Sequence, residues 1–209
     1  MKILFLSHDS HLHGATRSML DLAEEFSNKG HEAKVILPTG GLAENYLKNK
    51  HIPFKKVFYP LFIQYGKEDK LKTQFKKLYS AFRHLPILVS YIKEYNPDII
   101  YINTSVNYWL LILSFFYKKP IILHLREFGK EDHAVFKNFK GLMFNLLKKR
   151  ATLYLSNSRA IQQYYQEKYQ IKSYLLYNGV FKRETFIQNS TLKKINLKVR
   201  QPLLVWLVI

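Results

Sequence analysis

Cysteine is absent from this chain of 209 residues. Its absence excludes disulfides, thiolate metal sites and cysteine nucleophiles. Acidic residues are scarce, because 15 Asp and Glu stand against 33 Lys and Arg, and the formal net charge is +18. Three explanations compete for this charge: a nucleic-acid ligand, an anionic membrane surface, and a bias in composition in which Lys outnumbers Arg.

Long apolar runs are also missing. The longest, 109–117, is followed by Lys118 and Lys119, and it is far shorter than the roughly 20 residues that cross a bilayer as a helix. The apolar start of the chain ends at His8, before it reaches the length of a secretory signal core. We therefore expect a cytoplasmic protein that is soluble or lies on the inner face of the cell membrane.

Several well-known motifs are missing too. The chain contains neither the dinucleotide fingerprint G-x-G-x-x-G nor the phosphate loop G-x-x-x-x-G-K-[ST]. It also lacks the serine-hydrolase elbow G-x-S-x-G. Neither a zinc finger nor an RNP-type strand is present, and the basic residues are spread along the chain. Nucleic acid is therefore disfavoured as a partner, in spite of the charge.

What the chain does have is an alternation of short apolar runs with longer amphipathic stretches. The apolar runs are 3–6, 33–37, 54–58, 99–102, 121–123, 153–155 and 174–176. Apolar runs that alternate with helical stretches are typical of a parallel sheet covered on both faces. The pattern predicts an α/β fold, a doubly wound, Rossmann-like parallel sheet of about seven strands with helices on both faces.

The helical stretches have recognisable ends. Gly30 is expected to end the first helix, and Ser158 is expected to cap the helix that runs to Lys168. The basic stretch 67–95 predicts two helices with a break before Pro86, because an interior proline removes a backbone donor. Further helices are expected over 42–50, 106–117 and 135–150.

The pattern changes after residue 180. Residues 181–200 are polar and basic with little periodicity, whereas residues 201–209 form one apolar, strand-like run. A single strand cannot form a domain. We therefore predict a domain over 1–180, a linker over 181–200 and, over 201–209, the first strand of a C-terminal domain that is missing from the sequence.

Ligands of a parallel α/β sheet bind outside the carboxyl ends of the strands. The loop 8–15 follows the first strand and contains Asp9, His11 and Gly14. It precedes a helix whose first N–H groups suit a phosphate, although a plain strand-to-helix turn is the alternative. The pattern Asp9-x-His11 is similar to the opening of a metallophosphoesterase. We expect no metal, because the Asn-His pair of such a site is missing.

Another polar group follows the apolar run 121–123. A neutral His124 there suits a hydrogen bond to a sugar hydroxyl, and Arg126 suits a phosphate. A structural ion pair involving Arg126 and Glu127, with a histidine satisfied at a strand end, is the alternative.

Four blocks, taken in order, resemble the N-terminal domain of GT-B glycosyltransferases of family 4. The first combines residues 2–7 (KILFLS), 13–18 (HGATRS), Leu22-Ala23 and 29–35 (KGHEAKV), and the others are 96–104 (NPDIIYINT), 119–127 (KPIILHLRE) and 155–158 (LSNS) with 176–180 (LYNGV). The resemblance covers residues 1 to about 180. It implies the N-terminal half of a GT-B fold, in which a second domain supplies the other wall of the cleft.

The resemblance implies an activity as well. A sugar would pass from a nucleotide-sugar donor to a glycan or lipid-linked acceptor, with retention and without an obligatory metal or other cofactor. Cell-surface polysaccharide is the family-level expectation for the product. Because the second domain of the family carries the nucleotide-binding residues and a pair of Glu, we expect this chain alone to bind donor poorly and to transfer no sugar.

The same resemblance implies roles for individual residues. Gly14 and Ala15, with Arg17, would lie against the donor phosphates. His124 would contact the transferred sugar as the catalytic residue. The acceptor side would contain Asn103, Arg126 and Glu127.

The basic residues suggest a further property. Lys72, Lys76, Lys77 and Arg83 interleave with apolar residues over 67–93, a pattern of helices that lie on anionic membranes. An ordinary surface helix with a solvated face is the alternative. Two other functions stay open, namely a basic nucleic-acid-binding protein and a non-catalytic partner subunit whose cleft another chain completes.

Overall fold

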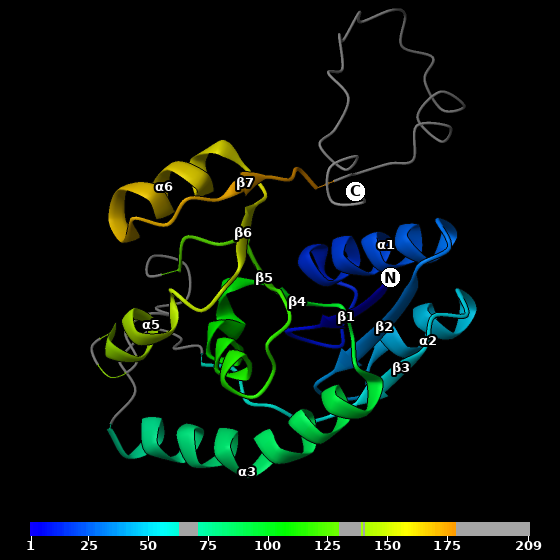
Figure 1. The fold of residues 1–209 in the computed structure, drawn as a ribbon, viewed down its shortest axis with the longest axis horizontal. Coiled ribbons are helices and arrows are strands. Elements are labelled where there is room, and N and C mark those ends of the chain that lie inside the picture. Colours follow the sequence, from blue (N-terminus) through cyan, green and yellow to red (C-terminus); the bar gives the residue numbers. More distant parts are fainter. Residues whose placement is uncertain (63–70, 130–138, 140, 179–209) are drawn as a thin grey trace, which may run out of the picture.

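Seven strands form one sheet in the order β3-β2-β1-β4-β5-β6-β7 (Figure 1). The computed structural model describes residues 1–62, 71–129, 139 and 141–178, and every neighbouring pair of strands in it is parallel. The strands are β1 (Lys2–Leu6), β2 (Glu32–Leu37), β3 (Phe54–Lys56), β4 (Ile99–Asn103), β5 (Ile121–Leu125), β6 (Leu153–Ser156) and β7 (Tyr174–Leu175). The predicted doubly wound α/β fold is confirmed.

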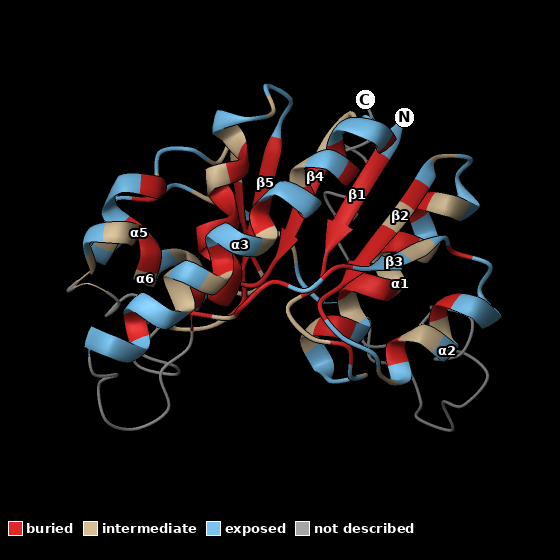
Figure 2. Cartoon of the chain, turned by 90° about the horizontal axis from the view of Figure 1, so that it is seen from below, coloured by how far each residue is buried: buried red, intermediate tan, exposed pale blue. Residues whose placement is uncertain are grey.

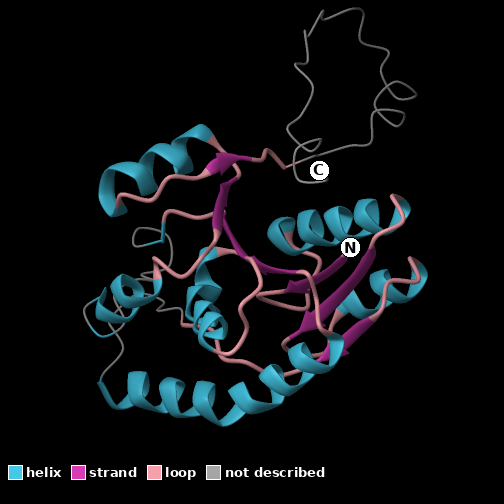
Figure 3. Cartoon of the chain, in the orientation of Figure 1, coloured by secondary structure: helices cyan, strands magenta, loops and turns pink. Residues whose placement is uncertain are grey.

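Helices cover both faces of the sheet (Figure 3). Those in the described ranges are α1 (Gly14–Asn28), α2 (Leu42–Asn49), α3 (Leu71–Tyr95), the 3₁₀ helix η1 (Ser105–Phe115), α5 (Leu142–Leu147) and α6 (Arg159–Tyr169). One face is covered by α1 and α2, and the other by α3, η1 and α5 (Figures 1 and 3). Within these ranges, no helix combines the length and the apolar character needed to cross a bilayer.

The central strands are apolar on both sides because both faces are covered (Figure 2). Phe5 of β1 packs beneath α1 in a layer that includes Met19 and Phe26. Its neighbours Leu4 and Leu6 lie in the opposite layer, beneath α3 and η1, since successive side chains of a strand alternate between faces. This two-sided burial explains the continuous apolar runs of the sequence.

The order of the strands changes direction between β1 and β4. From β1 the chain proceeds outward through β2 to β3, and from β4 it proceeds outward to β7. The segments that leave β1 and β4 therefore turn to opposite faces, toward α1 and η1. Such a divergence leaves a crevice at the carboxyl ends of the two strands, where ligands of doubly wound proteins bind.

The ends of α1 and α6 match their sequence signals. Gly30 follows the end of α1 with φ of +80°, a left-handed conformation that glycine adopts without steric cost. At the start of α6, the Ser158 hydroxyl accepts a hydrogen bond from the Ile161 N–H at 3.2 Å. Both predictions are confirmed.

The prediction of a break before Pro86 is wrong, because α3 is one helix from Leu71 to Tyr95 with Pro86 inside it. Leu85 and Leu88, on either side of the proline, are buried against the sheet. Burial of such side chains gives about 1.5–3 kcal/mol each, enough to offset the roughly 3 kcal/mol that an interior proline costs. The first residues of the predicted stretch, 67–70, lie outside the described residues.

Two other segments differ from expectation. The stretch 106–117 was expected to be an ordinary helix, but it forms the 3₁₀ helix η1 with non-helical dihedral angles at Asn107. The Asn107 side chain donates to the Ser7 carbonyl at 3.2 Å, so a tertiary contact overrides local preference. Of the helix predicted over 135–150, the described part is helical at Leu142–Leu147. The predicted linker and the run 201–209 lie outside the described residues.

The cap of α6 can be tested by substitution. Ser158→Ala removes the acceptor of the Ile161 N–H, and we expect the free energy of unfolding to fall by about 1 kcal/mol. Urea denaturation followed by circular dichroism measures this change. Ser158→Asp restores an acceptor and should stay close to the wild type; an equal loss in both variants would contradict the capping role.

Candidate active site

The polar residues of four segments meet at the carboxyl edge of the sheet. Asn103 is the last residue of β4 and His124 the last but one of β5, and the two are partners in the register of these strands. The Asn103 side-chain amide donates to the carbonyl of Ala15 at 3.2 Å, which fastens the start of α1 to the end of β4. The structure therefore brings Gly14, Ala15, Asn103 and His124 to one edge.

His124 belongs to β5 itself and does not follow it, and only 1% of its surface is exposed. Burial lowers the pKa of its imidazole well below the ordinary value, and the adjacent Arg126 lowers it further. The ring is therefore neutral at physiological pH. One of its nitrogens, Nδ1, is hydrogen-bonded to the Tyr101 hydroxyl.

The Tyr101 hydroxyl is the hydrogen-bond partner of His124 Nδ1. Burial raises the pKa of the Tyr101 phenol, an effect that Arg126 partly opposes, so the hydroxyl stays protonated and is able to donate to Nδ1. With Nδ1 as the acceptor, the hydrogen of the neutral ring lies on Nε2. This Nε2 is buried and has no hydrogen-bond partner among the described residues. A buried donor of this kind is costly unless it meets a partner.

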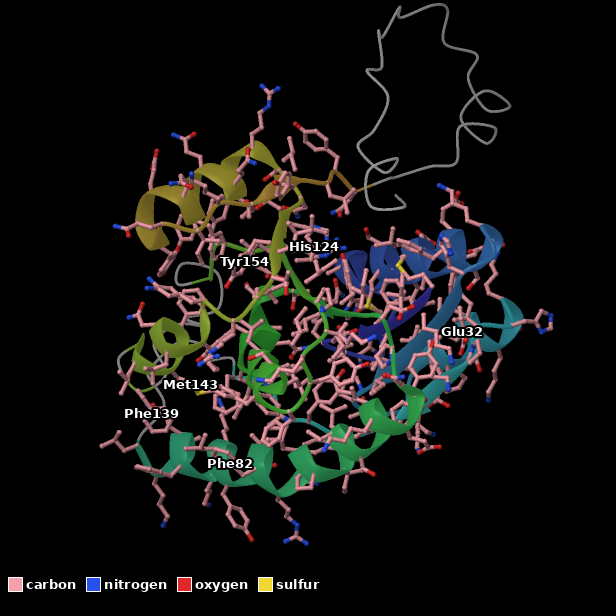
Figure 4. All side chains as sticks on the ribbon, viewed as in Figure 1. Glu32, Phe82, His124, Phe139, Met143 and Tyr154 are labelled. Carbon is pink, nitrogen blue, oxygen red and sulfur yellow. The ribbon has the colours of Figure 1, made fainter. Side chains whose placement is uncertain are left out.

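A pocket of about 150 Å³ opens beside His124, between α1 and the segment after β7. Its walls are Ser18, Asp21, Leu22 and Glu25 of α1, His124 and Arg126 at the end of β5, and Leu176, Tyr177 and Asn178. Figure 4 shows His124 between α1 and the strands β5 and β6. The pocket therefore offers carboxylate and hydroxyl groups on one wall and the imidazole on the other.

Asn178 joins the two walls of this pocket. Its side-chain oxygen accepts from Arg126 Nη1 at 2.6 Å and from the Ser18 hydroxyl at 3.2 Å. Arg126 is 8% exposed, and its Nε has no hydrogen-bond partner in the described part of the chain. The guanidinium thus lines the pocket and is held there by Asn178.

The loop after β1 is organised around Asp9. Its carboxylate accepts from the Thr16 hydroxyl at 2.6 Å and from the His11 N–H at 3.1 Å, and it lies 3.4 Å from a nitrogen of His8 and 3.6 Å from one of His13. Across the described ranges, no group of three or more His, Asp and Glu side chains has the arrangement of a metal site. Asp9 shapes the loop and aligns it with the start of α1.

The turn between β2 and α2 packs against the loop that follows β1. A side chain at Gly41 would place its Cβ 2.4 Å from the Ser10 carbonyl oxygen, so only glycine permits this approach. The same carbonyl accepts from the Ala43 N–H at 2.9 Å. The β2–α2 turn therefore fixes the backbone of the loop.

The N-terminus of α1 is open. His13 precedes the helix in an extended conformation without a side-chain cap, and the first turn contains no acidic residue. Gly14 has an ordinary φ, and a Cβ there would meet nothing within 4 Å. The first N–H groups and the positive end of the helix dipole thus remain available to an anion.

Arg17 lies in the first turn of α1, but its guanidinium contacts Asp21 and Tyr46. It contacts Asp21 at 2.9 Å, and its guanidinium stacks 4.8 Å from the ring centre of Tyr46 on α2. Asp21 also raises the pKa of Arg17. The structure does not bring Arg17 to the His124 pocket.

Glu127 and Asn103 shape the turn after β4. Glu127 accepts from the N–H and the hydroxyl of Ser105, at 3.1 and 2.7 Å. Between Asn103 and Ser105, Thr104 has φ of +71° although it is not glycine, a strained conformation of the kind found at functional sites. The side-chain oxygens of Asn103, Thr104 and Asn107 are buried without a hydrogen-bond partner among the described residues.

Sequence reasoning missed Tyr101, the partner of His124. The two residues lie on the same face of neighbouring strands, since Tyr101 pairs with Ile122 and His124 lies two positions further along β5. Diagonal neighbours of this kind are within reach of an aromatic side chain. The contact between Tyr101 and His124 could therefore have been predicted from the sequence, once β4 and β5 were expected to be adjacent.

Comparison with known proteins identifies the family. The sequence profile described as Glycosyltransferase Family 4 matches residues 12–181. The Anabaena protein Alr3699/HepE in complex with UDP-glucose is similar, with a TM-score of 0.63 and 24% identity over 86% of this chain and 44% of that chain. MurG of Acinetobacter baumannii is similar with a TM-score of 0.54 and 14% identity, over 93% of this chain and 51% of that chain. A search of curated protein sequences gave no match.

The sheet, its two helical layers and these likenesses define a Rossmann-like domain of the GT-B glycosyltransferases. The chain belongs to glycosyltransferase family 4. It spans about half the length of the solved structures that it matches, with shares of 44% to 51% for the proteins above.

The buried state of His124 predicts a pH dependence of stability. The folded state holds the imidazole neutral with a lowered pKa, whereas the unfolded chain takes up a proton below about pH 6.5. Stability from this source is complete above that pH and is lost as the pH falls. Between about pH 6.5 and 5.5 the wild type should lose about 1 kcal/mol more than His124→Gln. Urea denaturation at both pH values measures this, and parallel losses would contradict a neutral His124.

Glu127 is expected to act through the turn at Ser105. Glu127→Ala leaves two buried donors without an acceptor and should lower the free energy of unfolding by about 1–3 kcal/mol. Glu127→Gln keeps an acceptor oxygen and should lose much less. Chemical denaturation of both variants provides the comparison. If Glu127→Ala were as stable as the wild type, the proposed role of Glu127 in the turn at Ser105 would be contradicted.

Proposed function

We propose that this chain forms one wall of the active-site cleft of a retaining glycosyltransferase. The enzyme transfers a sugar from a nucleotide-sugar donor to a glycan or lipid-linked acceptor in cell-surface polysaccharide synthesis, without an obligatory metal. One observation carries the proposal: the buried Nε2 of a neutral His124 has no hydrogen-bond partner among the described residues, and it lies at the edge that also holds the open N-terminus of α1.

The chemistry of glycosyl transfer suits these groups. The bond from the anomeric carbon to the leaving diphosphate breaks, a bond to the acceptor oxygen forms, and the proton of the acceptor hydroxyl passes to the leaving diphosphate. Positive charge develops on the sugar ring in the transition state. A neutral His124 donates a hydrogen bond to a sugar hydroxyl without adding a like charge beside that ring. The N–H groups at Gly14 and Ala15 suit the negative charge that develops on the leaving diphosphate.

The donor and the second wall are inferred from relatives. The Anabaena relative is a complex with UDP-glucose, which supports a uridine nucleotide-sugar as the first donor to test. Because this chain covers about half of such relatives, we propose that a second domain completes the cleft and holds most of the nucleotide. The acceptor side includes Asn103 and Arg126, and peripheral contact with an anionic membrane belongs to the same proposal.

Nuclear magnetic resonance with UDP-glucose tests the site. We expect binding to the 209-residue chain with a dissociation constant in the millimolar range, with amide shifts confined to residues around Gly14, His124 and Asn178. His124→Phe should lose the shifts around Asn178 while it stays folded. His51→Asn, on the opposite edge, is the matched control. Shifts elsewhere, or none at millimolar donor, would contradict the proposed site.

Turnover tests the need for a second wall. The chain alone should release no UDP from UDP-glucose above the buffer rate in the presence of glycan or lipid-linked acceptors, because it supplies only one side of the cleft. Coupled detection of UDP measures the rate. Donor-dependent glycosylated product from the chain alone would show that the second domain is dispensable.

A further inference from the structure

The face formed by α3, η1 and α5 displays large apolar side chains to solvent. Those that are half or more exposed are Leu71, Phe75, Tyr79, Phe82 and Ile87 on α3, Phe115 at the end of η1, and Leu142 and Leu146 on α5. Figure 2 views the molecule from the side of α3 and shows the exposed stripe of that helix. Contiguous exposed apolar surface of this kind marks an interaction site.

A groove runs through this face. It has a volume of about 340 Å³, and its walls include Leu78, Phe82, Leu85, Ile112, Met143 and Leu146. Figure 4 shows Phe82 on α3 and Met143 on the α5 side, far from His124. Arg150 lies at the groove with its guanidinium 4.1 Å from the ring centre of Phe115. The groove is thus hydrocarbon in character, with a cation at its border.

The charge on this face is mostly positive. The segments 71–93, 105–119 and 141–150 contain no Asp and no Glu, whereas Glu94 lies in the last turn of α3 and Asp98 pairs with Lys119 at 3.7 Å. Their basic residues are Lys72, Lys76, Lys77, Arg83, Lys93, Lys118, Lys119, Lys148, Lys149 and Arg150. An apolar groove within such a rim complements a molecule that has an anionic head and a hydrocarbon tail.

The two kinds of residue alternate along α3. Leu71, Phe75, Tyr79 and Phe82 follow one another at spacings of four, four and three residues, which places them on one stripe of the helix. Three basic residues, Lys72, Lys76 and Arg83, each come one position after a residue of this stripe. Aromatic rings flanked by long cationic side chains are typical of helices in the interface of a bilayer.

We infer that α3, η1 and α5 form a docking surface for an anionic membrane. Acyl-chain atoms enter the groove at Phe82 and Met143, and the surrounding Lys and Arg contact lipid phosphates. This surface makes the membrane contact that the proposed function includes. The inference rests on the proposed function only where it links the surface to a membrane-bound acceptor. Lipid binding itself depends on this face alone.

The topology connects this surface with the candidate active site. The chain leaves β3 at the carboxyl edge and ends α3 at the opposite edge, where the Tyr95 hydroxyl donates to the Glu32 carbonyl at 3.2 Å. The beginning of α3, with Phe75 and Tyr79, therefore lies nearest the carboxyl edge. Docking through this half of the helix brings the edge that holds His124 close to the headgroups.

Vesicle flotation tests the inference with the full chain. Phosphatidylglycerol-containing vesicles should carry the wild type at low salt, whereas pure phosphatidylcholine vesicles should not. Lys72→Gln/Lys76→Gln/Arg83→Gln should lower the partition coefficient by about a hundredfold, since each cation contributes about a fivefold gain near an anionic surface. Phe75→Ser/Phe82→Ser should also lower it by at least tenfold at a salt concentration that screens charge.

Matched controls come from the other parts of the surface. Leu42→Ser and the combined Lys29→Gln/Lys48→Gln/Lys172→Gln replace exposed residues outside this face and should bind like the wild type. Circular dichroism confirms that each variant is folded. Absence of flotation, equal loss in the controls, or full binding by Phe75→Ser/Phe82→Ser would overturn the inference, as would binding of an oligonucleotide duplex in place of vesicles. Donor-induced shifts at His124 in the same preparation report separately on the proposed function.

Discussion

Parallel pairing of β1, β4 and β5 is the constraint on which the rest of the structure depends. Because β4 lies between the other two, the ends of all three strands reach one edge. The loop after β1 then starts α1 on one face, while the turn after β4 starts η1 on the other. The side-chain amide of Asn103 donates to the Ala15 carbonyl and so joins the end of β4 to the start of α1. Without this register, the imidazole and the helix end would not lie at the same edge.

Burial gives the edge its chemical character. His124 is neutral because water is excluded from it and Arg126 lies beside it, and its Nδ1 is hydrogen-bonded to the Tyr101 hydroxyl. Several buried oxygens of the turn after β4 also have no hydrogen-bond partner in the part of the chain that the structure describes. Buried polar atoms without hydrogen-bond partners destabilise a folded protein, and they are found at sites where a bound ligand supplies the partner. The strain at Thr104 belongs to the same pattern.

Much of this arrangement was predictable from the sequence. Continuous apolar runs record burial on two faces, so the strands, their parallel sense and the shared edge of Gly14 and His124 followed from composition and order. The contact of Tyr101 with His124 was not predicted, because it depends on the direction of side chains across two strands. The continuity of α3 through Pro86 was missed for a similar reason, since burial of Leu85 and Leu88 outweighs local preference.

The placement of α1 and α3 on opposite faces of the sheet separates the two surfaces that the proposals assign to ligands. Under the proposed function, a water-soluble nucleotide would approach from the α1 side, where the helix end is open. An amphiphile held along α3 would arrive from the other side of the sheet. On that arrangement neither reactant would obstruct the other, and the two could bind in either order.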